Sequence, residues 1–406
     1  MCECAAMRRL AWFGLGSGVL AIAGFVASGC VGDSVISTPA NDAATNADAA
    51  TEAAPPTCDK PTTVCGDKCV TTATDGKNCG TCGHDCGGGM CTDGICQPMA
   101  IRQNLDPNLT LAVNGEGVYF ASSMDPQFRI QKCPLDGCTQ APATFGAMIN
   151  TIDALEATTG TVIFLSSNQS TKQRPSLYYC TNAGCPVAAT VISGQQIDTD
   201  GLGSLYDLVV YGDDLYWGHQ NAKAWKHSAC DSATCAGPDI QQTNVPFPAA
   251  ALHASDASGS YYIDGLAIKR CPVAGACTPT ETAIPISVNM LRPGGGKMLL
   301  LHTGVTPNLD GTISACATPD CLGGPLPVIT KLAFPTTMVA TATDVVWYAD
   351  DLKKLQTCTI ATCVPRDLVG NLGTVGFTQL HAFGKVAYWV QQGAAAGSAS
   401  VWRIAL

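Results

Sequence analysis

The chain has 406 residues, with 22 Lys and Arg against 32 Asp and Glu, so its formal net charge is −10 at pH 7. An acidic chain with only 13% charged residues lacks the clustered basic surface that holds nucleic acid, and we predict no nucleic-acid partner. Its 42 glycines and 24 prolines are typical of a turn-rich, all-β protein.

Residues 1–30 are predicted to be an export signal. Arg8 and Arg9 precede an apolar run over residues 10–26, and small residues follow up to Cys30. This end of the run resembles a bacterial lipobox, whose cysteine receives lipid and becomes the mature N-terminus. We therefore predict lipid attachment at Cys30, with simple secretion or a retained helical anchor as alternatives. Val31 at the next position favours the outer membrane, on its periplasmic side or at the cell surface.

Residues 31–57 contain Ala, Thr, Asn, Asp and Pro without any periodicity. Such a segment cannot bury enough apolar surface to fold. We predict a disordered tether between the membrane and the rest of the protein.

Residues 58–98 form a small module with many glycines and few large apolar residues. A segment of this size has no hydrophobic core and needs covalent cross-links. Its eight cysteines are Cys58, Cys65, Cys69, Cys79, Cys82, Cys86, Cys91 and Cys96. They allow roughly a hundred disulfide connectivities, and the sequence does not choose among them.

A zinc site is the alternative for this module, because Cys79 and Cys82 have C-x2-C spacing and His84 is close by. One such pair in an exported chain is weak support for a metal. Of the 23 cysteines, 20 remain after the export signal and the lipidated residue are removed, and they divide into even sets of eight and twelve. These numbers favour disulfides, and we predict neither a metal nor a cofactor.

Residues 99–406 are predicted to form a seven-bladed β-propeller. Seven apolar segments, each preceded by turn-forming residues, recur at intervals of about 45 residues, and each reads as the second strand of a four-stranded unit. These segments are 118–120, 162–164, 215–217, 260–263, 298–301, 345–348 and 386–389. One blade alone cannot bury both of its faces, whereas blades stacked around an axis bury them all.

Six of the repeats carry a pair of cysteines between their third and fourth strands. The pairs are Cys133 with Cys138, Cys180 with Cys185, Cys230 with Cys235, Cys271 with Cys277, Cys316 with Cys321, and Cys358 with Cys363. We predict one disulfide in each pair, because the spacing is unusual for zinc and the pairs lie far apart around the ring. A loop this short contributes about 2 kcal/mol per bridge.

The seventh repeat contains three strand-like segments, at 377–382, 386–390 and 400–404, and no cysteine pair. A further strand-like segment, Met99–Leu105, stands before the first repeat. We predict that this segment is the missing outer strand of the last blade and closes the ring. The alternative is that it is only a linker.

Histidines fall at two kinds of position in the repeats. His253 and His381 sit at equivalent places in first strands, which favours a structural role for both. His219 and His302 follow second strands and enter the loops between the second and third strands. Those loops emerge on one face of a propeller, near its axis, where ligands usually bind.

The candidate ligand face combines polar residues of both charges from several of these loops. They are Arg174, His219, Asp264, His302, Asp350 and Gln391, with Asp125 and Arg129 in the first repeat. A solvated loop surface is the alternative for each of these residues.

The lipobox-like stretch at Cys30, the run TTATDGKNCGTCGHDC at 71–86 and the form VYF…RIQKCPLDGC at 118–138 occur together. In this combination the chain resembles the cysteine-rich, propeller-bearing exported lipoproteins of myxobacteria. The resemblance covers essentially the whole mature chain. It implies architecture and an exported location, and it says little about activity.

No catalytic motif stands out, because nucleophile-elbow, zinc-protease, P-loop and dinucleotide-binding patterns are all missing from the sequence. We therefore predict a lipid-anchored binding or scaffold protein with a protein or glycan partner. The alternative is an exported hydrolase or lyase that acts on polysaccharide or a small metabolite. A cluster of His219, His302 and either Asp264 or Asp350 in one pocket would favour that alternative.

Overall fold

The computed structural model describes most of the chain after the predicted tether. The described residues are 57–406 except 107, 123–124, 126–128, 148–150, 169–172, 182–183, 186–189, 192–204, 212–213, 220–222, 228–239, 247–252, 257–258, 273–279, 285–286, 305–309, 318–320, 322–323, 371, 373–376 and 394–397. The predicted export signal, Cys30 and the tether up to residue 56 thus lie outside them. Among the described residues, no helix has the length and apolarity needed to cross a membrane.

The described residues contain seven four-stranded antiparallel sheets, one for each predicted repeat. Blade 1 consists of β6 (Leu109–Asn114), β7 (Gly117–Ser122), β8 (Arg129–Cys133) and β9 (Ala143–Ala147). Blade 2 consists of β10 (Thr151–Ala157), β11 (Thr161–Asn168), β12 (Gln173–Thr181) and β13 (Thr190–Val191). Blade 3 consists of β14 (Leu205–Tyr211), β15 (Asp214–His219), β16 (Lys223–His227) and β17 (Ile240–Pro246). Blade 4 consists of β18 (His253–Asp256), β19 (Gly259–Asp264), β20 (Ala267–Pro272) and β21 (Thr280–Ala283).

The remaining sheets continue the same order. Blade 5 consists of β22 (Met290–Gly294), β23 (Lys297–His302), β24 (Asp310–Ala317) and β25 (Leu326–Ala333). Blade 6 consists of β26 (Pro335–Ala340), β27 (Asp344–Ala349), β28 (Lys354–Thr359) and β29 (Arg366–Val369). Blade 7 consists of β30 (Phe377–Phe383), β31 (Val386–Gln392), β32 (Ala399–Ala405) and β5 (Met99–Leu105). The cysteine-rich module has two short hairpins, β1 (Thr63–Cys65) with β2 (Lys68–Val70) and β3 (Cys91–Thr92) with β4 (Ile95–Cys96).

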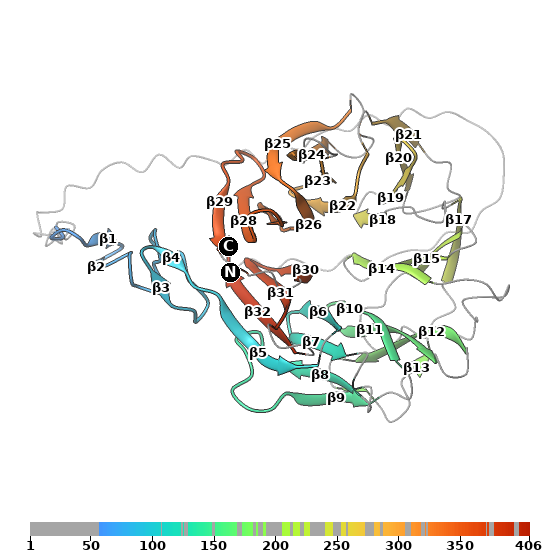
Figure 1. Cartoon of the computed structure of the whole chain (residues 1–406), viewed down its shortest axis with the longest axis horizontal. Helices are drawn as coiled ribbons and strands as arrows, with labels where there is room; N and C mark the ends of the chain where they lie inside the picture. Colours follow the sequence, from blue (N-terminus) through green and yellow to red (C-terminus); the bar gives the residue numbers. More distant parts are fainter. Residues whose placement is uncertain are drawn as a thin grey trace, which may run out of the picture. The chain divides into compact units, whose positions relative to one another are not determined.

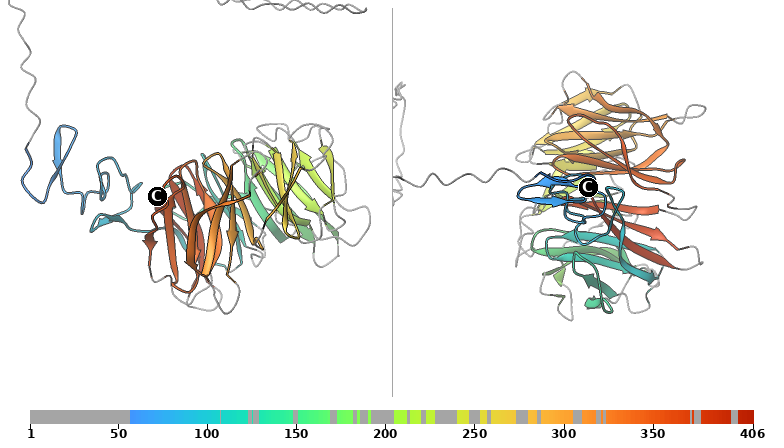
Figure 2. Two further views of the ribbon diagram at one scale, coloured as in Figure 1. Left: turned by 90° about the horizontal axis from the view of Figure 1, so that it is seen from above. Right: turned by 90° about the vertical axis from the view of Figure 1, so that its left-hand side faces the viewer.

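The blades close into a ring. The first strand of each blade contacts the first strand of the next, and β30 of blade 7 contacts β6 of blade 1. Figure 1 shows the sheets following one another around this ring, and Figure 2 shows them edge-on. The outer strand of blade 7 is β5, which pairs with β32 from the other end of the chain, as the sequence predicts for Met99–Leu105. The all-β propeller fold is thereby confirmed.

The core lies in the seams between blades. Second strands are the most apolar part of each repeat because both of their faces meet a neighbouring blade. Accordingly Trp347 and Trp389, in β27 and β31, are completely buried. The hydrophobic clusters each combine residues of two adjacent blades, such as Phe120 of blade 1 with Val390 of blade 7.

The hairpin disulfides form as predicted wherever both cysteines are described. They join Cys133 to Cys138, Cys180 to Cys185, Cys316 to Cys321 and Cys358 to Cys363.

The two remaining blade pairs are not tested in full. Cys271 is disulfide-bonded, but its predicted partner Cys277 lies outside the described residues. In blade 3, Cys230 and Cys235 both lie outside the described residues, in the segment 228–239. The disulfide between Cys230 and Cys235 therefore stays a prediction, which rests on the sequence repeat alone.

Two of these disulfides lie in turns that join a blade to the blade before it. The second cysteine of the hairpin turns its backbone N–H toward the preceding outer strand: Cys138 donates to the Ile101 carbonyl at 3.2 Å, and Cys185 donates to the Phe145 carbonyl at 3.0 Å. Both pairs of sulfurs pack in the seam clusters. The cross-link therefore orders a turn whose backbone joins two blades.

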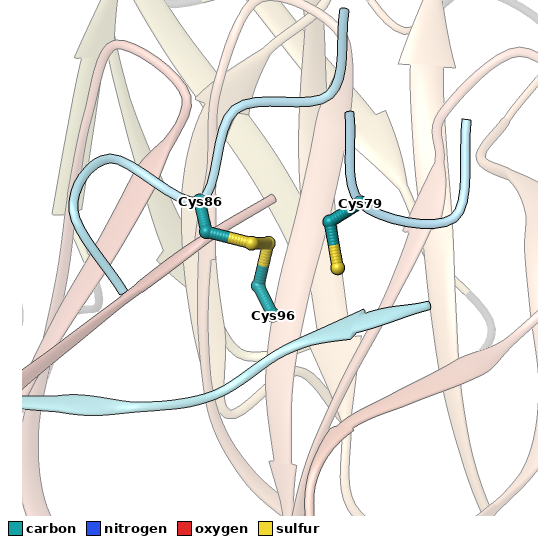
Figure 3. Close-up of side chains that lie close together, drawn as sticks. All are labelled: Cys79, Cys86 and Cys96. Carbon is teal, nitrogen blue, oxygen red and sulfur yellow. A yellow bond between two sulfur atoms is a disulfide. The ribbon is translucent and has the colours of Figure 1, made fainter. Parts of the chain in front are cut away.

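The structure selects one connectivity for the cysteine-rich module. Its disulfides are Cys58–Cys69, Cys65–Cys82, Cys79–Cys91 and Cys86–Cys96. The sulfurs of Cys79, Cys86 and Cys96 lie within 4.8 Å of one another, because the Cys79–Cys91 and Cys86–Cys96 disulfides pack together. Figure 3 shows the Cys86–Cys96 disulfide beside the Cys79 sulfur. Cys79 and Cys82 are both bonded to other cysteines, so the C-x2-C pair has no free thiolate for zinc.

The module fills the seam between blades 6 and 7. Blade 7 has no cysteine hairpin, and Ile404 occupies in β32 the register position at which the other blades have their first cysteine. The buried sulfurs of Cys79, Cys86, Cys91 and Cys96 belong instead to the cluster of this seam, together with Leu368 and Leu406. The module therefore supplies the disulfide packing that the last blade lacks.

Candidate functional site

The residues of the predicted ligand face whose side chains are described form hydrogen bonds or ion pairs with near neighbours in the structure. The Asp264 carboxylate lies 2.6 Å from Lys269 Nζ, across its own hairpin. The Asp350 carboxylate lies 2.8 Å from Lys353 Nζ, three residues along the chain. These pairs neutralise their charges within single blades.

The other predicted face residues have similar surroundings. His302 is the last residue of β23 rather than the first of the loop, and its Nδ1 lies 2.5 Å from the Ser287 carbonyl oxygen. Gln391 Nε2 donates to the Leu372 carbonyl at 2.9 Å. The side chains of Arg174 and His219 lie outside the described part of the structure.

Asp125 and Arg129 form one side of a small pocket at the loop end of blade 1. Asp125 is only 3% exposed, and its carboxylate accepts hydrogen bonds from Arg129 Nε at 2.8 Å and from the Arg129 backbone N–H at 3.3 Å. The hydrogen bond to Asp125 is also the main reason that the pKa of Arg129 is raised. The pair joins the start of β8 to the loop that precedes it, and this structural role accounts for both residues.

A different set of residues converges from the inner strands of several blades. Each blade begins with a hairpin of its first and second strands, and we number the cross-strand pairs outward from the turn. Because the blades repeat around one axis, equivalent pairs lie at one level of the ring. In blades 2 and 6 the first pair is the one that closes the turn by a backbone hydrogen bond, Thr158 with Thr161 and Thr341 with Asp344. We call the first-strand residues of the third pair the axial layer. They are Ala112, Glu156, Val209, Ala254, Arg292, Val339 and His381.

The axial layer holds three polar, titratable side chains among four small apolar residues. Glu156, Arg292 and His381 are partly exposed, although they stand on innermost strands, so solvent reaches them inside the ring. Ala112 and Ala254 are fully buried. The three polar residues come from blades 2, 5 and 7, and so they approach from three separate directions.

The charge of Arg292 acts on both of the other polar residues of the layer. Burial among the surrounding strands raises the pKa of Glu156 to about 8, and the Arg292 cation opposes that rise. Burial lowers the pKa of His381 to about 4, and Arg292 lowers it further. The charge of one residue on blade 5 therefore reaches residues on blades 2 and 7.

Sequence reasoning placed His381 wrongly. His253 pairs with Tyr262 and is the fourth residue from its turn, whereas His381 pairs with Tyr388 and is the third. Successive residues of a strand point to opposite faces, so the two histidines are not equivalent. Aligning the seven hairpins on their turns, instead of on strand positions, would have brought Glu156, Arg292 and His381 into one column.

Chemically, the axial layer is a set of hydrogen-bond donors around one fixed cation. At neutral pH a carboxyl group with a pKa of about 8 is mostly protonated, and an imidazole with a pKa of about 4 is neutral. Glu156 and His381 can each donate a hydrogen bond in these states, and Arg292 carries a permanent positive charge. Arg292 Nη1 also donates to the Leu291 carbonyl at 2.8 Å, which restrains the guanidinium.

Comparisons with known proteins identify the fold only. No protein-family model and no curated protein matches the chain. YCF48 from Cyanidioschyzon merolae is similar with a TM-score of 0.52 and 10% identity, over 76% of this chain and 99% of that one. YCF48 bound to D1 peptide has a TM-score of 0.51 and 10% identity, over 76% and 96%. BamB from Moraxella catarrhalis has a TM-score of 0.42 and 9% identity, over 72% and 83%.

Proposed function

We propose that the protein is an exported, lipid-anchored binding protein that takes its ligand at the axial layer. The observation that carries this proposal is the placement of Glu156, Arg292 and His381 at one level inside the ring, within reach of solvent. Polar groups that converge in an otherwise apolar setting are the usual mark of a ligand site. A propeller fold similar to this one has been solved with a peptide bound.

Export is supported by the cysteines. Disulfides persist in oxidising compartments, and the module and four of the described blade hairpins carry them. Lipid attachment at Cys30 is supported by the small residues before it and by the apolar run that precedes them. The hydrolase or lyase alternative needs a cluster of His219, His302 and either Asp264 or Asp350. The His219 side chain lies outside the described part of the structure, and the other three side chains bond locally.

Replacing Cys30 with serine is expected to move the protein from the membrane fraction to the soluble fraction. The serine hydroxyl cannot form the thioether that carries the lipid, and the rest of the chain would lose its anchor. Fractionation of cells that express the full chain, with detection by immunoblot, measures this change. A Cys30→Ser protein that stays with the membrane after a high-salt wash would contradict the lipid anchor.

Binding at the axial layer is tested with the purified exported protein and a panel of soluble glycans, peptides and small metabolites. We expect at least one compound to bind saturably in calorimetry, and we expect its affinity to fall at least tenfold in the triple variant Glu156→Gln, Arg292→Met, His381→Gln. Circular dichroism confirms that the variant is folded. The proposal fails if no compound binds, or if every compound binds the triple variant as tightly as the original protein. Steady turnover of a panel member would support the enzyme alternative instead.

A further inference from the structure

We propose that the Cys79 sulfur is placed to exchange disulfides with the Cys86–Cys96 bridge, so that the two buried disulfides of the cysteine-rich module form a disulfide relay. The observation behind this proposal is a short distance. The Cys79 sulfur lies within 4.8 Å of the sulfurs of both Cys86 and Cys96, and the sulfur of Cys91, its own bonding partner, does not belong to this group. Figure 3 shows the Cys79 sulfur beside the bridge.

Exposure determines where the relay begins. Cys91 is 8% exposed, whereas Cys79 is 0%, Cys86 5% and Cys96 3% exposed, so a dithiol from solvent meets Cys91 first. A thiolate that attacks the Cys91 sulfur expels the other sulfur of the bond, which is that of Cys79. The expelled Cys79 thiolate is therefore released next to the second disulfide.

The exchange that follows conserves the number of disulfides. The Cys79 thiolate attacks the Cys96 sulfur, a Cys79–Cys96 bond forms, the Cys86–Cys96 bond breaks, and Cys86 leaves as a thiolate. Attack on Cys86 instead expels Cys96. The dithiol, which is bound to Cys91 after the first attack, closes on itself as a cyclic disulfide and releases the Cys91 thiol. Two electrons enter the module in total, and the dithiol supplies them.

The relay is specific to this part of the module. Among the described residues, the sulfurs of Cys58, Cys65, Cys69 and Cys82 belong to no such group of three. The Cys58–Cys69 and Cys65–Cys82 disulfides therefore have no third sulfur placed to attack them, and opening either one should leave only its own two thiols.

The relay also lies where the module meets the ring. Cys86 is followed by Gly87, whose backbone carbonyl accepts a hydrogen bond from Arg403 of blade 7. The cysteines of the relay belong to one hydrophobic cluster with Trp389 of β31. A new partner for Cys86, or none, releases the cross-link beside this contact. The redox state of the module is thereby coupled to its hold on blade 7.

Two variants that lose the same disulfide test the placement of the sulfurs. Cys91→Ser leaves the Cys79 thiol free, and Cys79→Ser leaves the Cys91 thiol free. Each purified exported protein is alkylated without reductant in mildly alkaline buffer, and peptide mass spectrometry identifies the labelled cysteines. In Cys91→Ser we expect at least about a tenth of the label on Cys86 and Cys96, because exchange moves the free thiol there. In Cys79→Ser the label should stay on Cys91.

Two results of this comparison overturn the proposal. If the label in Cys91→Ser is confined to Cys79, the sulfur does not exchange with its neighbours. If the label reaches Cys86 and Cys96 equally in both variants, the loss of a cross-link explains the exchange, and the position of Cys79 does not.

The original protein provides a test that does not depend on how the variants fold. It is treated briefly with limiting dithiothreitol, and the new thiols are trapped by alkylation. We expect Cys91 to be labelled together with Cys86 or Cys96, and Cys79 to carry less than about half the label of Cys91, because Cys79 enters a new disulfide. Cys58 and Cys69 are the internal control and should be labelled equally. Equal label on Cys79 and Cys91, with none on Cys86 or Cys96, would show that no relay operates.

Discussion

Replacing Arg403 with methionine is expected to lower the free energy of unfolding by about 3–5 kcal/mol. Arg403, on β32, is only 6% exposed. Its Nη1 donates to the Leu135 carbonyl of blade 1 at 2.7 Å, and its Nη2 donates to the Gly87 carbonyl of the cysteine-rich module. It also hydrogen-bonds Tyr388 of its own blade. One cation therefore joins blade 7, blade 1 and the module at the place where the ring closes.

The size of this effect follows from what the substitution leaves behind. Methionine fills a similar volume, so the lost contribution is that of hydrogen bonds to a charged donor, each of roughly 1.5–3 kcal/mol. Two backbone carbonyls would also remain near the seam without their donor. Urea unfolding, followed by tryptophan fluorescence, measures the change.

The matched control is Arg366→Met, which removes an exposed arginine from the outer strand of blade 6. It should change the free energy of unfolding by no more than about 0.5 kcal/mol, as surface substitutions usually do. If Arg403→Met were as mild as this control, the module would not be held to the ring through Arg403.

Much of the fold could be predicted because its signals are local and repeated. Each blade has a turn, a buried second strand and a short cysteine hairpin, and seven copies make the period visible. The closing role of Met99–Leu105 could be predicted because blade 7 lacks one strand and this segment has no other partner nearby. The turn sets the register of each hairpin, and the residues Asn114–Gly117 are a clear turn signal in the sequence.

Contacts between the cysteine-rich module and the blades, and between residues of distant blades, could not be predicted from local repeated signals. The disulfides of the module lie in the seam beside Leu406, but nothing periodic relates the module to blade 7. Likewise Glu156, Arg292 and His381 are far apart in the sequence and belong to no motif. Only the closure of the ring brings them together, and a one-residue error in register, as with His253, hides the relation.

We expect the contribution of Glu156 and His381 to the free energy of unfolding to be highest, and nearly constant, between about pH 4.5 and 6.5. Folding raises the pKa of Glu156 from 4.5 to about 8, so the folded state holds this proton more tightly than the unfolded chain does. The resulting stabilisation is complete below pH 4.5 and is lost as the pH rises toward 8. Folding lowers the pKa of His381 from 6.5 to about 4, so its contribution is complete above pH 6.5 and is lost as the pH falls toward 4.

Single substitutions should separate the two opposing effects. Each proton changes the free energy of unfolding by at most about 1.4 kcal/mol per pH unit, and between pH 4.5 and 6.5 the two slopes cancel. Glu156→Gln lacks the glutamate effect, so its stability relative to the original protein should rise as the pH rises from 4.5 to 8. His381→Gln lacks the histidine effect, so its stability relative to the original protein should rise as the pH falls from 6.5 to 4.

The measurement is urea unfolding at pH 4, 5.5, 6.5 and 8, compared as the difference between each variant and the original protein. Other groups titrate in this range, and taking the difference removes their common contribution. If the Glu156→Gln and His381→Gln difference profiles were level, neither residue would change its proton affinity on folding.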